Sequence, residues 1–134
     1  MSRAPEDRTS WVLDASAVLS VLQGEPGAER VLGVLPLAVI STVNLSEVVG
    51  KLLDVGMPDV EIPQVVGALG LETVPFGDEA AWRAAGLKRK TQPLGLSLGD
   101  RACLATGLVL GLPVLTADRA WTKLDLPIRI ECVR

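Results

Sequence analysis

Four acidic residues stand at points of this 134-residue chain where parallel strands and the helices after them place functional side chains. They are Asp14, Glu47, Asp100 and Asp118. Carboxylates that are packed together repel one another, and this repulsion raises their pKa values unless a cation binds between them. A site built only from oxygen ligands suits Mg²⁺ or Mn²⁺. If the four side chains converge, the sequence therefore predicts a divalent metal site.

The chain contains no histidine, which excludes several kinds of catalytic site. A Ser-His-Asp triad, a Cys-His dyad, a histidine-bound zinc and a histidine pair for acid-base cleavage of RNA are all ruled out. The two cysteines, Cys103 and Cys132, lie far apart in apolar segments. They argue against a disulfide framework or a thiolate metal cage, and they fit a reducing cytoplasm.

Composition points to one globular domain, with 49% apolar and 22% charged residues and a net charge of −3. No run of about 20 apolar residues is present, so we expect no membrane span. Residues 1–10 are polar and are predicted to form a flexible arm, which leaves residues 11–134 as the single domain. The high apolar fraction for so small a chain favours a homodimer formed through apolar helix surface, where Trp82 is expected in the core or an interface.

Positive charge is concentrated in one short part of the chain. The basic residues there are Arg83, Lys88, Arg89 and Lys90. They are explained either as a solvated helix end, which the helix dipole favours, or as contacts to phosphates. The sequence leaves both explanations open.

The elements that position the acids follow from the hydrophobic pattern. We expect strands at Trp11–Leu13 and at residues 37–41, 72–76, 113–116 and 128–132. We expect helices at residues 17–22, 27–35, 45–56, 78–85 and 98–110, another that begins near Pro58, a helical turn at 120–123, and Asp78 as an N-cap. Strands separated by helices predict a mainly parallel sheet in a three-layer α/β/α sandwich.

Each acid also has a purely structural explanation. Asp14 and Asp118 can cap the helices that follow them, and the pattern Ser97-x-x-Asp100 matches a capping box. Glu47 is harder to explain in this way, because it lies early in a mostly apolar helix, where an unpaired charge is costly. Capping would not account for all four side chains meeting at one edge of the sheet.

The segments around the acids resemble the PIN domain family. They are residues 12–19 (VLDASAVL), 44–48 (NLSEV), 95–105 (GLSLGDRACLA) and 115–118 (LTAD). The segments occur in the family's order and extend the match over nearly the whole chain, from Trp11 to Ile130. Within the family, the likeness is to the VapC-type toxin ribonucleases of bacterial toxin-antitoxin pairs.

The resemblance implies a PIN fold and a Mg²⁺- or Mn²⁺-dependent endoribonuclease that leaves 5′-phosphate and 3′-hydroxyl ends. It also implies an RNA substrate and a small cognate antitoxin that inhibits the enzyme with an Arg or Lys in the acidic pocket. Asp14 and Asp100 become the principal metal ligands, Glu47 completes the site and orients the attacking water, and Asp118 serves a second metal or an outer shell. The supporting polar residues that match are Ser16, Asn44 and Thr116.

The sequence leaves two other functions open. One is a catalytically silent PIN scaffold that only binds a protein partner. The other is a receiver-like phosphoacceptor domain, which also gathers acids and Mg²⁺ at strand ends. Such a domain needs adjacent acids after its first strand, whereas Asp14 is followed by Ala15 and Ser16. The receiver-like alternative therefore fits the sequence poorly.

Overall fold

The protein, described at residues 10–134 from a computed structural model, is built around one parallel sheet. Its five strands lie in the order β3-β2-β1-β4-β5, and every neighbouring pair is parallel. The strands are β1 (Trp11–Leu13), β2 (Ala38–Ser41), β3 (Glu72–Val74), β4 (Val114–Thr116) and β5 (Ile130–Cys132). The predicted α/β class and parallel sheet are confirmed.

Helices connect the strands and cover both faces of the sheet. The α-helices are α1 (Ala15–Leu22), α2 (Ala28–Val34), α3 (Thr42–Asp54), α4 (Ile62–Gly67), α5 (Asp78–Gly86), α6 (Lys88–Thr91) and α7 (Leu98–Leu110). Short 3₁₀ turns are η2 (Leu35–Leu37), η3 (Gln92–Leu94) and η4 (Arg119–Lys123). None of the helices within residues 10–134 is long and apolar enough to cross a bilayer.

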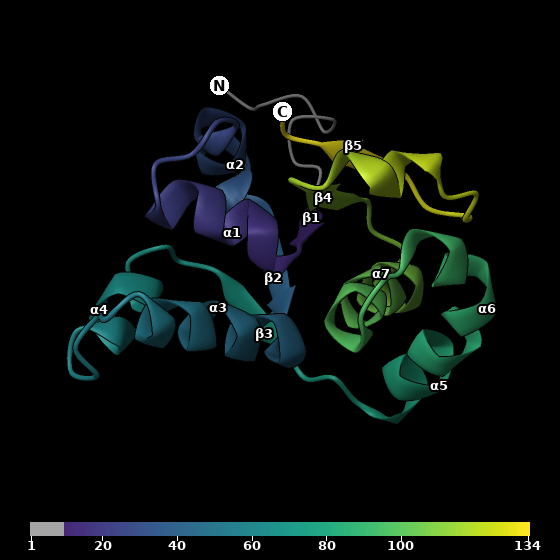
Figure 1. The fold of residues 1–134 in the computed structure, drawn as a ribbon, viewed down its shortest axis with the longest axis horizontal. Helices are drawn as coiled ribbons and strands as arrows, with labels where there is room; N and C mark the ends of the chain where they lie inside the picture. Colours follow the sequence, from purple (N-terminus) through teal and green to yellow (C-terminus); the bar gives the residue numbers. More distant parts are fainter. Residues whose placement is uncertain (1–9) are drawn as a thin grey trace, which may run out of the picture.

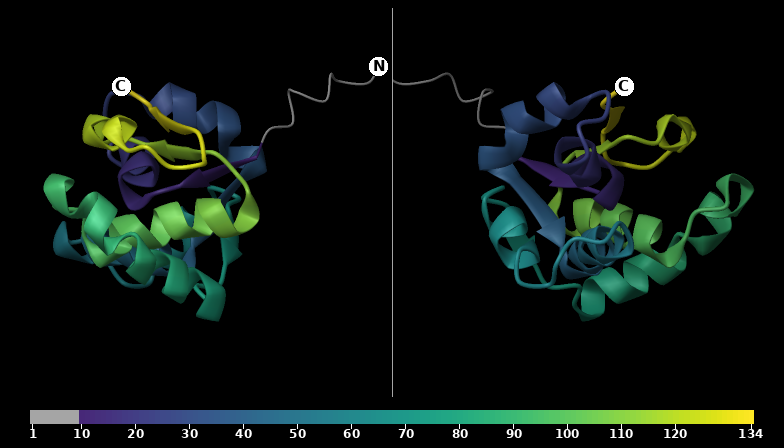
Figure 2. Two further views of the ribbon diagram at one scale, coloured as in Figure 1. Left: turned by 90° about the vertical axis from the view of Figure 1, so that its right-hand side faces the viewer. Right: turned by 60° about the vertical axis from the view of Figure 1, so that its left-hand side comes forward.

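The alternation of side chains along β1 divides the core into two layers. Trp11 and Leu13 face one side, where they pack with residues of α1, α2 and α3. Val12 faces the other side and packs with Cys103 and Leu104 of α7. Figure 1 shows α1 and α2 on one side of the strands and α5 and α7 on the other. The turned views in Figure 2 show α7 running along the sheet.

Several predicted bounds differ from the observed ones for local reasons. Leu37 belongs to a 3₁₀ turn that contains Pro36, so β2 begins one residue later than expected. The strand predicted at residues 72–76 ends before Pro75, which has no N–H to donate to a strand partner. Helix α3 begins earlier than expected, because the side chain of Ser41 caps it by accepting from the N–H of Val43 (3.1 Å).

Two predicted helix starts were wrong. The N-cap of α5 is Gly77, and Asp78 is instead the first helical residue, where its charge suits the positive end of the helix dipole. Pro58 does not begin a helix; α4 starts at Ile62, with Pro63 in its first turn. The arm predicted for residues 1–10 lies outside the described residues except for Ser10.

The parallel arrangement sets where a site can form. The carboxyl ends of β1 and β4 lie side by side in the middle of the sheet, with Leu13 paired to Leu115. Asp14 follows β1 directly, and Thr116 is the last residue of β4. Ligands of such sheets bind at the carboxyl ends of the strands, so we expect the functional site at this edge.

Candidate active site

Asp14 is a buried carboxylate at the junction of β1 and α1. Its Oδ1 accepts a hydrogen bond from the N–H of Ala17 (2.9 Å), as an N-cap does. Its Oδ2 accepts from the hydroxyl of Thr116 (2.7 Å). The hydroxyl of Ser16 lies 2.8 Å from both oxygens. These contacts hold Asp14 in one orientation at the edge of the sheet, and the predicted capping role is confirmed.

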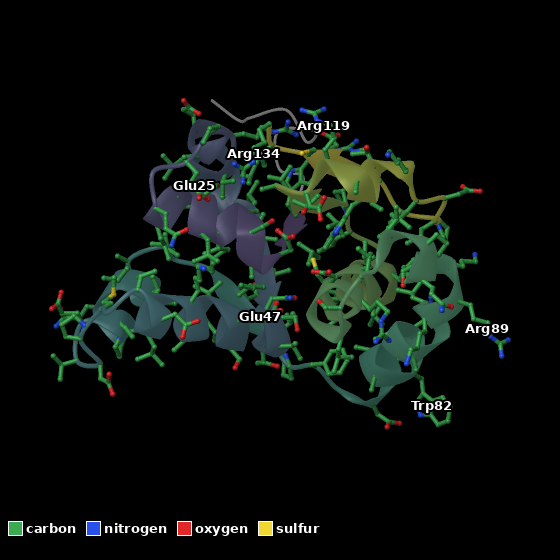
Figure 3. All side chains as sticks on the ribbon, viewed as in Figure 1. Glu25, Glu47, Trp82, Arg89, Arg119 and Arg134 are labelled. Carbon is green, nitrogen blue, oxygen red and sulfur yellow. The ribbon has the colours of Figure 1, made fainter. Side chains whose placement is uncertain are left out.

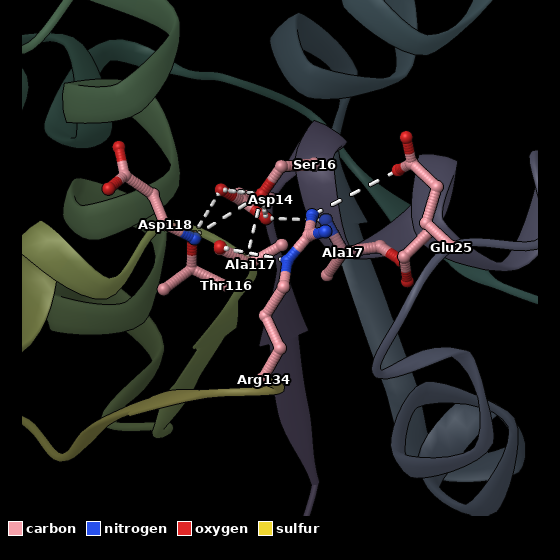
Figure 4. A network of polar contacts seen from close by, with 9 residues as sticks. Asp14, Ser16, Ala17, Glu25, Thr116, Ala117, Asp118 and Arg134 are labelled. Atoms are coloured by element: carbon pink, nitrogen blue, oxygen red, sulfur yellow. Dashed lines mark hydrogen bonds and ion pairs between the residues drawn. The ribbon is translucent and has the colours of Figure 1, made fainter.

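Ser16 and Thr116 also fasten β4 to the start of α1. The N–H of Ala117 donates to the Ser16 hydroxyl (3.0 Å), and the N–H of Asp118 donates to the Thr116 hydroxyl (3.0 Å). Figure 4 shows these bonds as one connected set around Asp14. Each hydroxyl thus accepts from the backbone and turns its proton to the carboxylate. The two hydroxyls therefore hold the Asp14 carboxylate in place.

The pKa of Asp14 is raised from 3.8 to about 6. Burial is the main cause, because it penalises the charged form. Hydrogen bonds from Thr116, Ala17 and Ser16 act in the opposite direction, and the negative charge of Asp100 raises the pKa further. A bound cation would relieve both the burial cost and the repulsion, so the site is electrostatically suited to one.

Asp100 stands in the first turn of α7 and forms the predicted capping box. Its N–H donates to the Ser97 hydroxyl (3.1 Å), and its Oδ2 accepts from the N–H of Ser97 (3.0 Å). The side chain of Asp100 is half-buried, and its charge acts on Asp14. Asp100 therefore caps its helix and also contributes negative charge to the site.

Glu47 reaches the same region from α3. Its Oε1 accepts a hydrogen bond from the side-chain amide of Asn44 (2.8 Å), which also donates to the backbone carbonyl of Gly99 (2.9 Å). The Glu47 carboxylate lies so close to Gly99 that a Cβ atom there would be 2.1 Å from Oε2. Glu47 is exposed, so the burial cost expected from its apolar helix does not arise. Its position is set instead by Asn44 and Gly99.

Cys103 shows which acids share one neighbourhood. Its thiol is fully buried one turn after Asp100, and burial raises its pKa well above the usual value. The charges of Asp14, Asp100 and Glu47 raise that pKa further. Three of the four predicted acids therefore act on the same buried thiol, which remains protonated and packs as part of the core.

Asp118 takes a different position. Its Oδ1 accepts from the N–H of Ala120 (3.0 Å) and so caps the 3₁₀ turn η4, which confirms the capping alternative. The side chain is exposed, and in Figure 4 its carboxylate points away from Asp14. The backbone N–H of Asp118, bonded to Thr116, is the part of this residue that joins the set of bonds around Asp14.

The acids do not form a closed metal cage. Across residues 10–134, no three acidic or cysteine side chains are grouped closely enough to hold one ion. The oxygen donors still fit Mg²⁺ or Mn²⁺, because Mg²⁺ commonly keeps several waters and is held by one or two carboxylates together with substrate phosphates. Asp14 and Asp100 are the pair whose charges interact at the edge of the sheet.

Gly99 and the orphaned oxygen of Asn44 are features that the sequence does not reveal. The amide of Asn44 is buried, and its Oδ1 has no hydrogen-bond partner. A buried, unsatisfied acceptor is costly, and the nitrogen of the same amide donates two hydrogen bonds, to Glu47 and to Gly99. The only signal in the sequence is the glycine before Asp100 in the first turn of a helix. Helical backbone does not require a glycine at this position.

The chain matches a known protein family. Residues 11–126 fit the family model described as PIN domain. A comparison with curated protein sequences gives no match. The matched residues begin at β1, three residues before Asp14, and include all four predicted acids.

Solved structures with the same fold include several toxin-antitoxin proteins. One is DNA-bound VapBC from Salmonella typhimurium, with a TM-score of 0.73 and 18% identity over 94% of this chain and 99% of that one. VapBC2 from Rickettsia felis, bound to a promoter fragment, has a TM-score of 0.73 and 12% identity over 92% and 98%. VapBC-5 from Mycobacterium tuberculosis has a TM-score of 0.62 and 21% identity over 92% and 98%. These likenesses establish a shared fold over nearly the whole chain.

Proposed function

Because this chain belongs to the PIN domain family, we propose that it is a metal-dependent endoribonuclease that hydrolyses RNA phosphodiester bonds with Mg²⁺ or Mn²⁺. The strongest support for this proposal is the position of Asp14. This residue is a buried carboxylate at the carboxyl end of a central strand, held by two hydroxyls and one backbone N–H, and its pKa is raised beside Asp100. A fixed carboxylate of this kind suits the binding of a divalent cation.

In this proposal each acid has a separate role. Asp14 and Asp100 hold the ion, directly or through water, and Asp118 belongs to an outer shell or a second ion. Glu47, fixed by Asn44 and reachable from solvent, orients the water that attacks the phosphate. When bound, the ion polarises the scissile phosphate, lowers the pKa of water and neutralises the leaving 3′-oxygen. No histidine is then required.

Ser16 and Thr116 support Asp14 in the proposed reaction. A ligand that is held by hydrogen bonds keeps its orientation when the ion or the substrate exchanges. Both hydroxyls contact Asp14 within 2.8 Å, and both are tied to the backbone of the loop after β4. They keep this loop in place beside Asp14 while RNA is bound.

We further propose that the protein is the toxin of a toxin-antitoxin pair. Its fold is shared with VapBC proteins of known structure. An Arg or Lys from a small antitoxin would pair with the acids and displace the cation. An apolar groove of about 470 Å³ between α3 and α4 suits an amphipathic helix of the same partner. Its lining residues are Leu45, Val49, Leu53, Asp59, Ile62, Pro63, Val66 and Gly67.

A homodimer is a second part of this proposal. The chain exposes large apolar side chains, among them Val60 (81%) and Trp82 (76%). Trp82 is therefore outside the core, and Figure 3 shows it pointing outward from α5. Exposed apolar surface of this kind favours association. Sedimentation at micromolar concentration is expected to give about twice 14.1 kDa, and a clean monomer there would count against the dimer.

The alternatives differ in one measurable way. Membership of the PIN family argues against the receiver-like domain. A catalytically silent scaffold would bind a partner without cutting RNA. The test is to map new RNA ends in total cellular RNA after incubation with the purified protein, with Mg²⁺ or Mn²⁺ and with EDTA. We expect metal-dependent 5′-phosphate and 3′-hydroxyl ends. If no new ends form under any condition, the catalytically silent scaffold is the function that remains.

A metal titration tests whether the antitoxin inhibits the protein at the acidic site. The protein is co-purified with the product of its neighbouring gene, and Mg²⁺ or Mn²⁺ is titrated while RNA cleavage is followed. Competition between cation and inhibitor predicts that cleavage recovers as the metal concentration rises. Inhibition that is insensitive to metal, and to replacing every Arg and Lys near the partner's carboxyl terminus by Ala, would place the inhibitory contact elsewhere.

A further inference from the structure

The chain after β5 is hydrogen-bonded to the acidic edge of the sheet. The N–H of Val133 donates to the carbonyl of Thr116 (2.8 Å), which continues the pairing of β5 with β4. On its other side Val133 packs against Gly27, where a Cβ atom would lie 2.5 Å from the valine side chain. Gly27 also has φ +95°, which favours glycine. The position of the next residue, Arg134, is therefore set by the sheet and by the start of α2.

Arg134 lies beside the bonds that hold Asp14. Its Nε donates to the carbonyl of Ala117 (3.4 Å), and the N–H of Ala117 donates to Ser16, which contacts Asp14. The backbone carbonyl of Arg134 accepts from the guanidinium of Arg119. Figure 4 shows the Arg134 guanidinium pointing toward this part of the sheet edge. A positive group thus stands beside the loop after β4, whose backbone is bonded to the residues that hold Asp14.

The guanidinium is held loosely. Its second contact, to Glu25, is 3.9 Å long, and both side chains are exposed by about two fifths (38% and 41%). An exposed ion pair of this length contributes little to stability, and a guanidinium has five N–H donors. Arg134 therefore retains donors for a ligand.

Three other arginines of the described residues are used differently. Arg30 and Arg129 both pair with Glu131 and lie 5.5 and 5.0 Å from the ring of Trp11. Trp11 begins β1, so this cluster marks the amino edge of the sheet, opposite the acids. In Figure 3, Arg89 points outward from α6. The contacts of Arg134 instead connect it to the acidic edge.

We propose that Arg134 binds a phosphate of the RNA strand next to the bond that is cut. This inference rests on the proposed ribonuclease function and adds a substrate-binding residue to it. The carboxylates repel an RNA backbone, whereas a guanidinium beside the loop after β4 attracts it and offers two parallel N–H donors to one phosphate. On binding, the phosphate replaces Glu25 as the partner of Arg134.

The test measures RNA binding separately from cleavage. Affinity for a single-stranded RNA oligonucleotide is measured at several salt concentrations, with Asp14→Asn in every protein to prevent cutting. Adding Arg134→Ala should weaken binding roughly tenfold, and the slope of log affinity against log salt should fall by about 0.7, as expected for one lost phosphate contact. Arg134→Lys should restore part of both.

Arg129→Ala is the matched control. It removes the same charge from the same end of the chain, but at the opposite edge of the sheet, and should leave both affinity and slope unchanged. Thermal unfolding of each variant shows whether the fold is intact; if Arg134→Ala does not fold, Arg134→Gln takes its place. In the cleaving protein, Arg134→Ala should raise KM more than it lowers kcat.

Three outcomes would overturn the inference. Arg134→Ala and Arg129→Ala with equal affinities would do so while the ribonuclease function stands. Tighter binding or faster cleavage by Arg134→Ala would instead show that Arg134 blocks access of RNA to the acidic site. A parent protein that neither binds nor cuts RNA would remove the proposed function, and this inference with it.

Discussion

The carboxylate of Glu47 rests against the backbone of Gly99, and this contact joins α3 to α7 at the acidic edge. Asn44 ties the two together, because its amide donates both to Glu47 (2.8 Å) and to the Gly99 carbonyl (2.9 Å). Gly99 directly precedes Asp100 in the first turn of α7. The position of one acid therefore depends on the backbone beside another.

Gly99→Ala is expected to impair cleavage without unfolding the protein. The added methyl group would lie 2.1 Å from Glu47 Oε2, so the solvent-exposed carboxylate must turn away and give up its hydrogen bond from Asn44. A displacement of this size in a catalytic group costs up to about a hundredfold in rate. Alanine is the better helix former by roughly 1 kcal/mol, which offsets the disturbance. Steady-state cleavage and thermal unfolding check the two halves of this prediction.

Gly50→Ala provides the control for that substitution. Gly50 lies on the same helix as Glu47, and no atom stands within 4 Å of a Cβ built there. It should keep full activity and equal or higher stability. Equal activity of the Gly99 and Gly50 variants would show that the position of Glu47 does not matter.

Asn44→Asp should destabilise the fold as well as the site. The change replaces a donor by an acceptor that faces Glu47 and the Gly99 carbonyl, inside a buried position. Losing the bond to the carbonyl of the buried Gly99 costs on the order of 1–3 kcal/mol, and a buried charge adds to this. Urea unfolding measures the loss. Gln64→Glu, the same change at an exposed residue of α4, should have little effect.

Stability without metal should fall as Asp14 ionises. The folded-state pKa of Asp14 is raised from 3.8 to about 6, so the folded protein holds this proton more tightly than the unfolded chain. The contribution to stability is complete below pH 3.8 and is lost as the pH rises through about 6. A difference of this size corresponds to about 3 kcal/mol.

Asp14→Asn isolates that contribution. The hydroxyls of Ser16 and Thr116 can each turn to accept from an amide, so the variant should fold. Its stability relative to the parent should increase between about pH 4 and pH 7 in urea unfolding with EDTA present. Asp125→Asn removes an equal charge from an exposed residue and serves as the control. A constant difference across this pH range would contradict the assigned burial cost.

Divalent metal should stabilise the wild-type protein and not the Asp14→Asn variant. A ligand that binds only the folded state adds about 2.7 kcal/mol at a concentration of 100 times its Kd. Thermal unfolding at pH 7 with Mg²⁺ or Mn²⁺ should therefore raise the Tm of the wild type by several degrees. An equal rise in both proteins would place the ion away from Asp14.

Sequence alone predicts the features that depend on local patterns. The parallel sheet follows from apolar strands separated by helices, and the capping roles of Asp14 and Asp100 follow from short spacings. The contact between Glu47 and Gly99 joins residues 52 positions apart, and it depends on how α3 packs on α7. Spacing along the chain carries no information on such packing.

Arg134 is a second feature that local patterns do not reveal. A lone arginine after an edge strand has no motif around it, and its place near Asp14 follows from the strand order, with β5 beside β4 and β4 beside β1. Glu25, its ion-pair partner, lies in the loop after α1. The sequence identifies these residues only as surface charges.

We propose that Asp14 and Asp100 hold the metal ion for RNA cleavage and that Glu47 completes the same site. The most direct measurement is the initial rate of cutting one defined RNA with saturating Mg²⁺ or Mn²⁺, for the wild type and for Asp14→Asn and Asp100→Asn, each shown to be folded. We expect metal-dependent cutting by the wild type and a loss of roughly a thousandfold or more in both variants. Full activity of Asp100→Asn, or wild-type cutting that is unchanged by EDTA, would contradict the proposed metal site.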